Sequence, residues 1–234
     1  MTADPAKRHL LPLLIPFLLA APVQASTCYG RPGAGSIAGA VALPADGANF
    51  EAYSRLGVQM GRTHVHAHVR EVVLDAYAAL ARSAPGTQFV YGETGLKEGG
   101  RMRPHRTHQN GLSIDFMVPV LDARGRSVPL PSSPLNKFGY GLEFDTGGKA
   151  GELRIDYPAL AEHLYALKEA AKRHEVGIAL VIFDPALMPA LLKTARGKEL
   201  EGLPFMKGKP WIRHDEHYHV DFDVPCQPVK IKAR

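Results

Sequence analysis

From residue 217 to residue 224 the chain alternates between two kinds of side chain. Apolar residues occupy the even-numbered positions, and histidine or aspartate occupies the odd-numbered ones. Because a β-strand places alternate side chains on opposite faces of a sheet, this pattern predicts a strand over about Tyr218–Val224 with one face in the core. The other face then carries His217, His219, Asp221 and Asp223. Two histidines spaced this way are about 7 Å apart at the backbone, so both can approach one site.

A second predicted strand, Leu112–Val120, carries a carboxylate. Asp115 points away from the side of the strand that bears Ile114 and Phe116, and a buried carboxylate needs a partner. His108 stands seven residues earlier, at the end of a glycine-rich loop that spans residues 95–111. Two imidazoles and one carboxylate, with a fourth position left to water, form the ligand set of a catalytic zinc site. The sequence therefore predicts a metal site that combines this segment with a histidine of the final strand.

The remaining elements mix helices and strands without regular βαβ alternation, which predicts an α+β fold with a mainly antiparallel sheet. Residues 26–50 and 121–156 are rich in glycine and proline and are expected to be irregular, the second with a hairpin near Phe138–Phe144. A long connection of this kind often flanks or covers a site. The other expected helices are Thr63–Arg82, the segment after Pro158 and Pro185–Thr194, and the other expected strands are Gln88–Tyr91 and Ile178–Phe183.

The N-terminus has the order of a secretory signal peptide. Lys7 and Arg8 precede the apolar run Leu10–Ala20, and Val23-Gln24-Ala25 offers small residues for cleavage. The run is about half the length of a transmembrane helix, although an anchor that stays attached is the alternative. We expect residues 1–25 to be removed and residues 26–234 to form one periplasmic domain, with no stable membrane insertion after cleavage.

The chain has two cysteines, Cys28 and Cys226, near the two ends of the exported part. Thiols in an oxidising compartment usually pair, so we expect a disulfide, with two separate buried thiols as the alternative. On the chain-entropy model a bridge that closes so long a loop stabilises the fold by up to roughly 5 kcal/mol.

Composition narrows the class of partner. Hydrophobic residues at 45% and charged residues at 22% are those of a globular protein rather than a disordered one. The net charge of +5 favours contact with the anionic polymers of a cell envelope. Nucleic acid is not expected as a partner, because the basic residues form no dense run and no patch interleaved with aromatic residues.

Two histidine clusters carry a family resemblance. The first reads His-x-x-His-Gln-x-Gly-Leu-x-x-Asp from His105 to Asp115, and the second reads Trp-x-x-His-x-x-His-x-His-Val from Trp211 to Val220. Together they resemble the penicillin-insensitive murein endopeptidase family, within the lysostaphin-type and D-Ala-D-Ala metallopeptidase superfamily. The resemblance implies a compact antiparallel sheet that carries one zinc ion. It also implies that the protein hydrolyses D-Ala–meso-diaminopimelate cross-links in peptidoglycan.

The resemblance also implies roles for individual residues. His108, Asp115 and His219 match the zinc ligands, His217 matches the catalytic histidine, and His214 and His105 match additional active-site histidines. The chain departs from the pattern in its few cysteines, its long connection at residues 121–156 and the acidic residues Asp215, Glu216 and Asp221 in and after the last motif. Glu216 is a rival general base, although a strand already regular at that position would point it to the opposite face.

Three other functions remain open from the sequence. They are a D-Ala-D-Ala carboxypeptidase or dipeptidase with a similar zinc site, a non-catalytic wall-binding module that keeps a structural metal, and a basic binding protein without metal. The remaining histidines are interpreted as structural. His163 and His174 are expected to be ordinary residues of their helix, whereas His64, His66 and His68 are expected at the surface or at the rim of a cleft.

Overall fold

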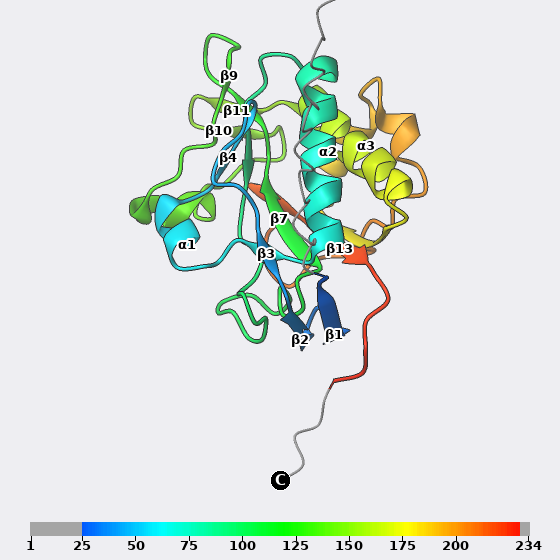
Figure 1. Cartoon of the computed structure of the whole chain (residues 1–234). Coiled ribbons are helices and arrows are strands. Elements are labelled where there is room, and N and C mark those ends of the chain that lie inside the picture. The colour runs from blue at the N-terminus through cyan, green and yellow to red at the C-terminus, as the bar shows by residue number, and fades with distance from the viewer. Residues whose placement is uncertain (1–24, 230–234) are drawn as a thin grey trace, which may run out of the picture.

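The computed structural model of the chain describes residues 25–229, so the predicted signal peptide lies outside the described residues apart from Ala25. Its central feature is a five-stranded sheet (Figure 1), in which every pair of neighbouring strands is antiparallel except the parallel pair β4–β6. The prediction of an α+β fold with a mainly antiparallel sheet is therefore confirmed. The strands, in spatial order, are β12 (Gly177–Ile182), β13 (His217–Asp223), β7 (Ser113–Met117), β6 (Phe89–Tyr91) and β4 (Phe50–Ala52).

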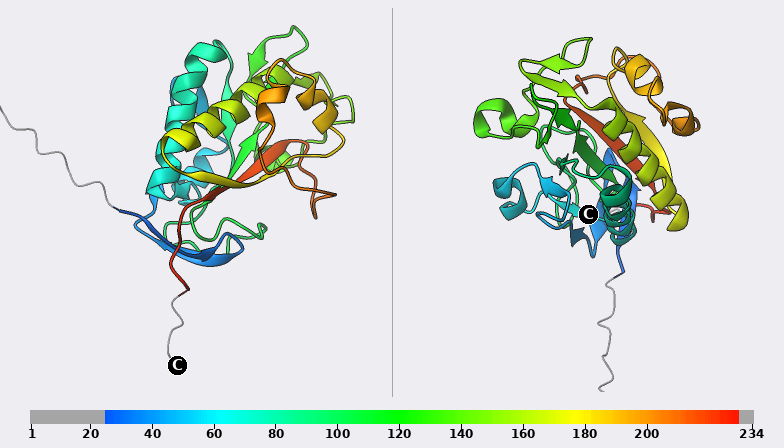
Figure 2. Two further views of the ribbon diagram at one scale, coloured as in Figure 1. Left: turned by 90° about the vertical axis from the view of Figure 1, so that its right-hand side faces the viewer. Right: turned by 90° about the horizontal axis from the view of Figure 1, so that it is seen from above.

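Two long helices, α2 (Ala67–Ser83) and α3 (Tyr157–Arg173), lie side by side and cover one face of this sheet (Figures 1 and 2). The apolar side chains of the two motif strands point into the layer between sheet and helices. Ile114 and Phe116 of β7 and Val220 and Phe222 of β13 are each no more than 1% exposed. The predicted alternation of both strands is therefore confirmed, and the polar face of each strand lies on the side of the sheet away from α2 and α3.

Smaller elements surround this core. A four-stranded sheet orders β10 (Lys149–Ala150), β11 (Leu153–Ile155), β8 (Val120–Leu121) and β9 (Ser127–Val128). Two further pairs are β1 (Thr27–Arg31) with β2 (Ala34–Ala38), and β3 (Val41–Ala42) with β5 (His64–Val65). The short helices are α1 (Arg55–Gln59), η1 (Pro134–Gly139), α4 (Met188–Leu192) and η2 (Gly197–Leu200).

Two segments expected to be irregular or to form a hairpin fold differently. The N-terminal arm contains the regular antiparallel hairpin β1–β2, in which Gly30 pairs with Gly35. Gly30 has a φ of 70°, and a Cβ there would lie 2.3 Å from the backbone oxygen of Ala34, so glycine permits the pairing. The hairpin expected near Phe138–Phe144 does not form, because the 3-10 helix η1 ends at Gly139 and turn and coil follow it. Residues 121–156 are also more regular than expected, since they contribute to the four-stranded sheet β10–β11–β8–β9.

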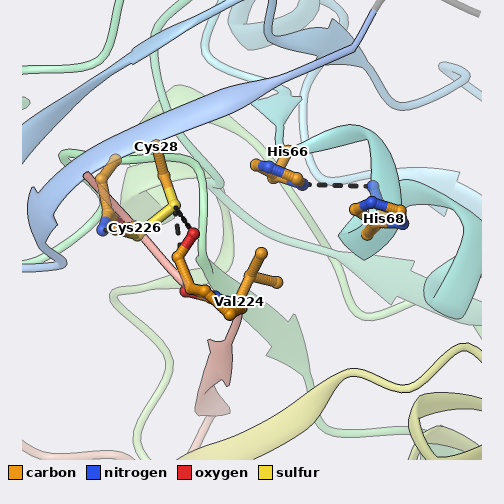
Figure 3. The surroundings of a disulfide bond; sticks show 7 residues. Cys28, His66, His68, Val224 and Cys226 are labelled. Atoms are coloured by element: carbon orange, nitrogen blue, oxygen red, sulfur yellow. Dashed lines mark hydrogen bonds between the residues drawn. A yellow bond between two sulfur atoms is a disulfide. The ribbon is translucent and has the colours of Figure 1, made fainter.

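His66 is not at the surface or at the rim of a cleft, which corrects that expectation for this residue. It is 3% exposed and forms the N-cap of α2, where its Nδ1 accepts a hydrogen bond of 3.3 Å from the backbone N–H of His68 (Figure 3). The helix accordingly starts at Ala67, four residues after the expected cap at Thr63. Burial lowers the pKa of His66 to about 4, which keeps the ring neutral and able to accept this bond.

Cys28 and Cys226 form a disulfide, which confirms the expected pairing (Figure 3). The bridge joins β1 to the segment after β13, two parts of the chain 198 positions apart. Backbone hydrogen bonds of 2.8 Å support it on both sides, from Gly30 N–H to the oxygen of Gln227 and from Gln227 N–H to the oxygen of Cys28. The N-terminal hairpin is thus fixed to the C-terminal end of the strand that carries the histidine motif.

The disulfide should contribute strongly to stability. We expect Cys28→Ser/Cys226→Ser to lower the free energy of unfolding by about 3–5 kcal/mol, because the reduced chain regains the conformational freedom of a very long loop when it unfolds. Chemical denaturation with and without a reducing agent measures this. The reducing agent should destabilise the unmodified protein and leave the double variant unchanged. Equal denaturation midpoints for the two proteins under oxidising conditions would contradict the assignment.

His163 should make the fold sensitive to acid. Its ring is 1% exposed on α3, among Tyr77, Phe89 and Phe116, and the Tyr218 hydroxyl bonds to its Nδ1. Burial lowers the pKa of His163 to about 3, whereas the unfolded chain takes up a proton below about pH 6.5. Stability from this residue is therefore fully present above about pH 6.5 and is lost as the pH falls towards 3, by about 2 kcal/mol at pH 5.

The variant His163→Gln tests this pH dependence, because glutamine still accepts a hydrogen bond from Tyr218 but takes up no proton. Urea denaturation at pH 7.5 and pH 5 should show a smaller acid destabilisation in this variant than in the unmodified protein. His64→Gln is the matched control, since this ring is only partly buried and lies outside the core. If His163→Gln lost as much stability between pH 7.5 and pH 5 as the unmodified protein, another group would be responsible for the acid destabilisation.

Candidate metal centre

The predicted ligands converge where β7 and β13 pair. Asp115 and His219 are direct register partners on these strands, so their side chains lie side by side on the face away from α2 and α3. His219 Nδ1 lies 2.8 Å from Asp115 Oδ1. His108 reaches the same oxygen from the loop before β7, with its Nε2 at 3.2 Å. Nitrogen atoms from two imidazoles thus surround one carboxylate oxygen, and all three side chains are buried.

The outer nitrogen of each imidazole is held by an oxygen atom. His108 Nδ1 lies 2.9 Å from the backbone oxygen of Thr94, and His219 Nε2 lies 2.8 Å from Asp221 Oδ1. The hydroxyl of Ser113 in turn donates a hydrogen bond to Asp221 Oδ1 at 2.5 Å. This arrangement orients ligating histidines in metal sites, because it fixes the tautomer and the direction of the inner nitrogen. Asp221, whose role the sequence did not suggest, is therefore the supporting carboxylate of His219.

One donor atom of the cluster is left without a hydrogen bond. His108 Nε2 is buried, and although it lies 3.2 Å from Asp115 Oδ1 it lacks the alignment that a hydrogen bond requires. A buried polar atom without a partner is costly, and a divalent cation among the three side chains would supply the missing partner. His108 is therefore one of the residues that could hold a metal ion beside Asp115.

The electrostatics of the cluster also suit a cation. Burial raises the pKa of Asp115, but the neighbouring His108 and His217 outweigh burial and hold this pKa well below its usual range. Burial lowers the pKa of His219, yet Asp221 and Asp115 on either side of the ring raise it to about 10. Asp115 is thus a carboxylate at neutral pH, and the centre of the cluster favours positive charge.

His105 lies on the other side of the Asp115 carboxylate. Its Nδ1 is 3.6 Å from Asp115 Oδ2, and its Nε2 contacts the carboxylate of Glu93. Donor atoms of His105, His108 and Asp115 all lie within 4.8 Å of one another, so these three side chains could also hold a metal ion. Glu93, which the sequence did not single out, also receives a hydrogen bond from Arg62. It anchors His105 in the same way that Asp221 anchors His219.

His217 and His214 form the other side of the site. His217 Nε2 lies 4.0 Å from Asp115 Oδ2, and its Nδ1 lies 2.9 Å from Glu216 Oε1. The ring centroids of His214 and His217 are 4.6 Å apart, and His214 Nδ1 lies 2.9 Å from the backbone oxygen of Ile212. Burial lowers the pKa of His217 and that of His214 to about 4, so both rings are neutral at neutral pH.

Glu216 lies in the cleft rather than on the opposite face of a strand. β13 begins only at His217, so the alternation of a regular strand does not yet apply to Glu216. Its Oε1 contacts His217, its Oε2 is buried without a hydrogen-bond partner, and burial raises the pKa of Glu216 to about 7. The residue is therefore positioned to orient His217.

Tyr140 is the main site residue that the sequence did not reveal. It comes from the long connection at residues 121–156, and its hydroxyl donates a hydrogen bond of 3.0 Å to Asp115 Oδ2. The same hydroxyl accepts a bond of 2.9 Å from the backbone N–H of Glu93. The length of the connection had indicated that it flanks a site. No spacing in the sequence distinguishes this tyrosine from its neighbours, because its partners lie 25 and 47 positions away.

A cleft of about 940 Å³ opens over the cluster. Its lining includes all six site residues expected from the sequence, together with aromatic and basic walls that contain Trp211, Lys137 and Arg213. Such a volume suits an extended peptide better than an ion alone. The complete set of six residues is His105, His108, Asp115, His214, His217 and His219.

The fold and the cleft define an α+β protein with a histidine and carboxylate centre that could hold a metal ion. The family model for penicillin-insensitive murein endopeptidases matches residues 28–233, and the chain therefore belongs to this family. It is also similar to the penicillin-insensitive murein endopeptidase of Haemophilus influenzae (strain ATCC 51907 / DSM 11121 / KW20 / Rd), with 26% identity over 195 residues. The alignment covers 82% of this chain but 62% of that relative, so the chain spans less than two thirds of its length.

Proposed function

We propose that the protein is a zinc-dependent peptidoglycan endopeptidase that hydrolyses D-Ala–meso-diaminopimelate cross-links. The observation that carries the proposal is the convergence of His108 Nε2 and His219 Nδ1 on Asp115 Oδ1 within an open cleft. Membership of the murein endopeptidase family supplies the substrate class. The substrate is then the cross-bridge peptide of the cell wall.

The zinc ligands in this proposal are His108, Asp115 and His219. His105 is the less suitable third ligand, because it faces Asp115 Oδ2 at 3.6 Å and this oxygen already accepts a hydrogen bond from Tyr140. Two nitrogen donors and one carboxylate are typical of a catalytic zinc ion, which needs a further position for water. His105 and Tyr140 then border the metal site and help to bind the substrate.

The mechanism is hydrolysis of a peptide bond by water. A zinc ion in this site would lower the pKa of its water to about 7 and polarise the substrate carbonyl. His217 accepts a proton from the attacking water, since its ring is neutral at neutral pH and its Nε2 faces Asp115. Glu216 holds the other nitrogen of His217 and fixes the orientation of the ring. His214 and His105 line the cleft on both sides and contact the peptide.

The proposal includes the place and extent of the domain. Residues 1–25 act as a signal peptide, residues 26–234 form a single domain, and the protein works in the periplasm. One contiguous hydrophobic core from Cys28 to Phe222 supports a single domain. Within residues 25–229, no helix combines the length and the apolar character that crossing a membrane requires.

Mass spectrometry of a digest of cross-linked muropeptides tests the activity. An endopeptidase converts dimers into monomers and leaves the terminal residues intact. Loss of a terminal D-Ala without loss of dimers would identify a carboxypeptidase instead. Dimers that stay intact after long incubation with zinc-loaded protein would favour a non-catalytic wall-binding module.

A further inference from the structure

A second cavity, of about 820 Å³, adjoins the cleft and shares with it Pro104, His105 and Arg106. Three arginines line it, Arg101, Arg103 and Arg106, and all three are exposed. Its other lining residues are Gly33, Ala34 and Gln109, so no carboxylate contributes to the lining. We call this cavity the arginine groove.

The guanidinium groups of the groove are available for a ligand. Among residues 25–229, no ion pair involves Arg101, Arg103 or Arg106. The arginines of the cleft differ in this respect. Arg62 is paired with Glu93, and Arg213 is paired with Glu143 and Asp215. Arg106 contacts an aromatic ring, with its guanidinium carbon 5.8 Å from the centroid of Trp211. Because arginine stays protonated and offers fixed N–H donors, three arginines without acidic partners favour a carboxylate ligand.

The backbone beneath the groove is held in place. Gln109 Nε2 donates hydrogen bonds to the backbone oxygens of Gly33 at 3.0 Å and Arg106 at 3.3 Å, and Gln109 N–H donates to Pro32. These bonds tie residues 106–109 to the β1–β2 hairpin, which the disulfide in turn fixes to the end of β13 (Figure 3). A groove with a fixed backbone binds at a lower entropic cost than a free loop.

The groove adjoins the metal centre. His105 borders both cavities, and its Nδ1 lies 3.6 Å from Asp115 Oδ2, so the groove is one side chain away from the metal centre. In a D-Ala–meso-diaminopimelate cross-link, the carbon that bears the amide nitrogen also bears a carboxyl group. A negative charge therefore lies next to the bond to be hydrolysed, on the side of the leaving amine.

We propose that the arginine groove binds the diaminopimelate carboxylate on the amine side of the cross-link and selects substrates in which this carboxyl group is free. The inference rests on the proposed function. It adds a specificity site that is separate from the six residues at the metal centre. The carboxylate accepts hydrogen bonds from Arg101 and Arg103, while Arg106 lies where the groove meets the cleft.

Steady-state kinetics on two muropeptide dimers test the proposal, one with free diaminopimelate carboxyl groups and one with these groups amidated. The unmodified protein should show a KM about tenfold higher or more for the amidated dimer, since charge-assisted hydrogen bonds are lost. In Arg101→Gln/Arg103→Gln the KM for the free dimer should rise to the amidated value, with kcat within about twofold of the original. Arg124→Gln is the matched control, because this exposed arginine lies in the turn between β8 and β9.

Binding to His217→Ala provides a readout with little turnover. This variant should bind the free dimer about tenfold or more tightly than the amidated dimer, and the preference should vanish when the two arginine substitutions are added. Equal affinity for both dimers, or a preference that survives the arginine substitutions, overturns the groove assignment while hydrolysis of dimers still supports the proposed function. A protein that hydrolyses neither dimer when loaded with zinc overturns both proposals.

Discussion

His219→Ala should lose the metal and the peptidase activity together. The substitution removes Nδ1 from the cluster and leaves the buried carboxylates of Asp115 and Asp221 without the ring that lies 2.8 Å from each of them. An uncompensated buried charge is strongly destabilising, so the thermal midpoint should fall as well. We expect less than one zinc per two chains after dialysis and a loss of about 10³-fold or more in kcat/KM, because binding and polarisation by the metal both disappear.

Asp221→Asn is the matched control for this prediction. It keeps all three proposed ligands but weakens the support of His219 Nε2, and loss of such a supporting group typically lowers metal affinity by 10–100-fold. Zinc content and activity should therefore recover in this variant when zinc is added in excess, unlike in His219→Ala. If His219→Ala kept one tightly bound zinc and His105→Ala lost it, the ligand set would be His105, His108 and Asp115 instead.

His217→Ala should separate metal binding from turnover. The His217 ring lies 4.0 Å from Asp115 Oδ2 and contacts neither His108 nor His219 through a hydrogen bond, so the metal ligands remain. We expect one zinc per chain and a loss of about 10²–10⁴-fold in kcat, the range attributable to a positioned general base. Zinc analysis and steady-state kinetics on the same preparation measure both quantities.

Glu216→Gln refines this prediction. Glutamine can still accept a hydrogen bond from His217 Nδ1, but it carries no charge to stabilise the protonated ring. We expect a loss of about tenfold in kcat with little change in KM, since the effect arises in the transition state. Near-normal turnover by His217→Ala would show that Glu216 or another group takes the proton, and Glu216→Gln would then cause the larger loss.

The sequence predicted the parts of the site that local periodicity determines. Alternation with period two assigned His219 and Asp115 to the polar faces of their strands, and the antiparallel pairing of β7 with β13 brings these faces together. The same rule placed Ile114 and Val220 in the core. The rule did not apply at Glu216, because the strand starts one residue later.

Contacts between distant segments that no sequence motif marks were not predicted. Tyr140 and Glu93 support the site from a long connection and from the residues after β6, and neither has a neighbouring residue that marks its role. The glycine content of the N-terminal arm led to the wrong prediction of irregular structure, because Gly30 permits a tight hairpin there. His66 was expected at the surface or at a cleft rim together with His64 and His68, because no metal-binding signature accompanies these histidines. Its ring instead replaces the usual short polar side chain as a helix cap.

The most direct test of the metal centre is an anomalous difference map, measured at the zinc absorption edge from a crystal of the zinc-loaded protein. We expect one peak per chain, about 2.0–2.2 Å from His108 Nε2, Asp115 Oδ1 and His219 Nδ1. A peak coordinated by His105 in place of His219, or no peak at this carboxylate, would contradict the proposed ligand set.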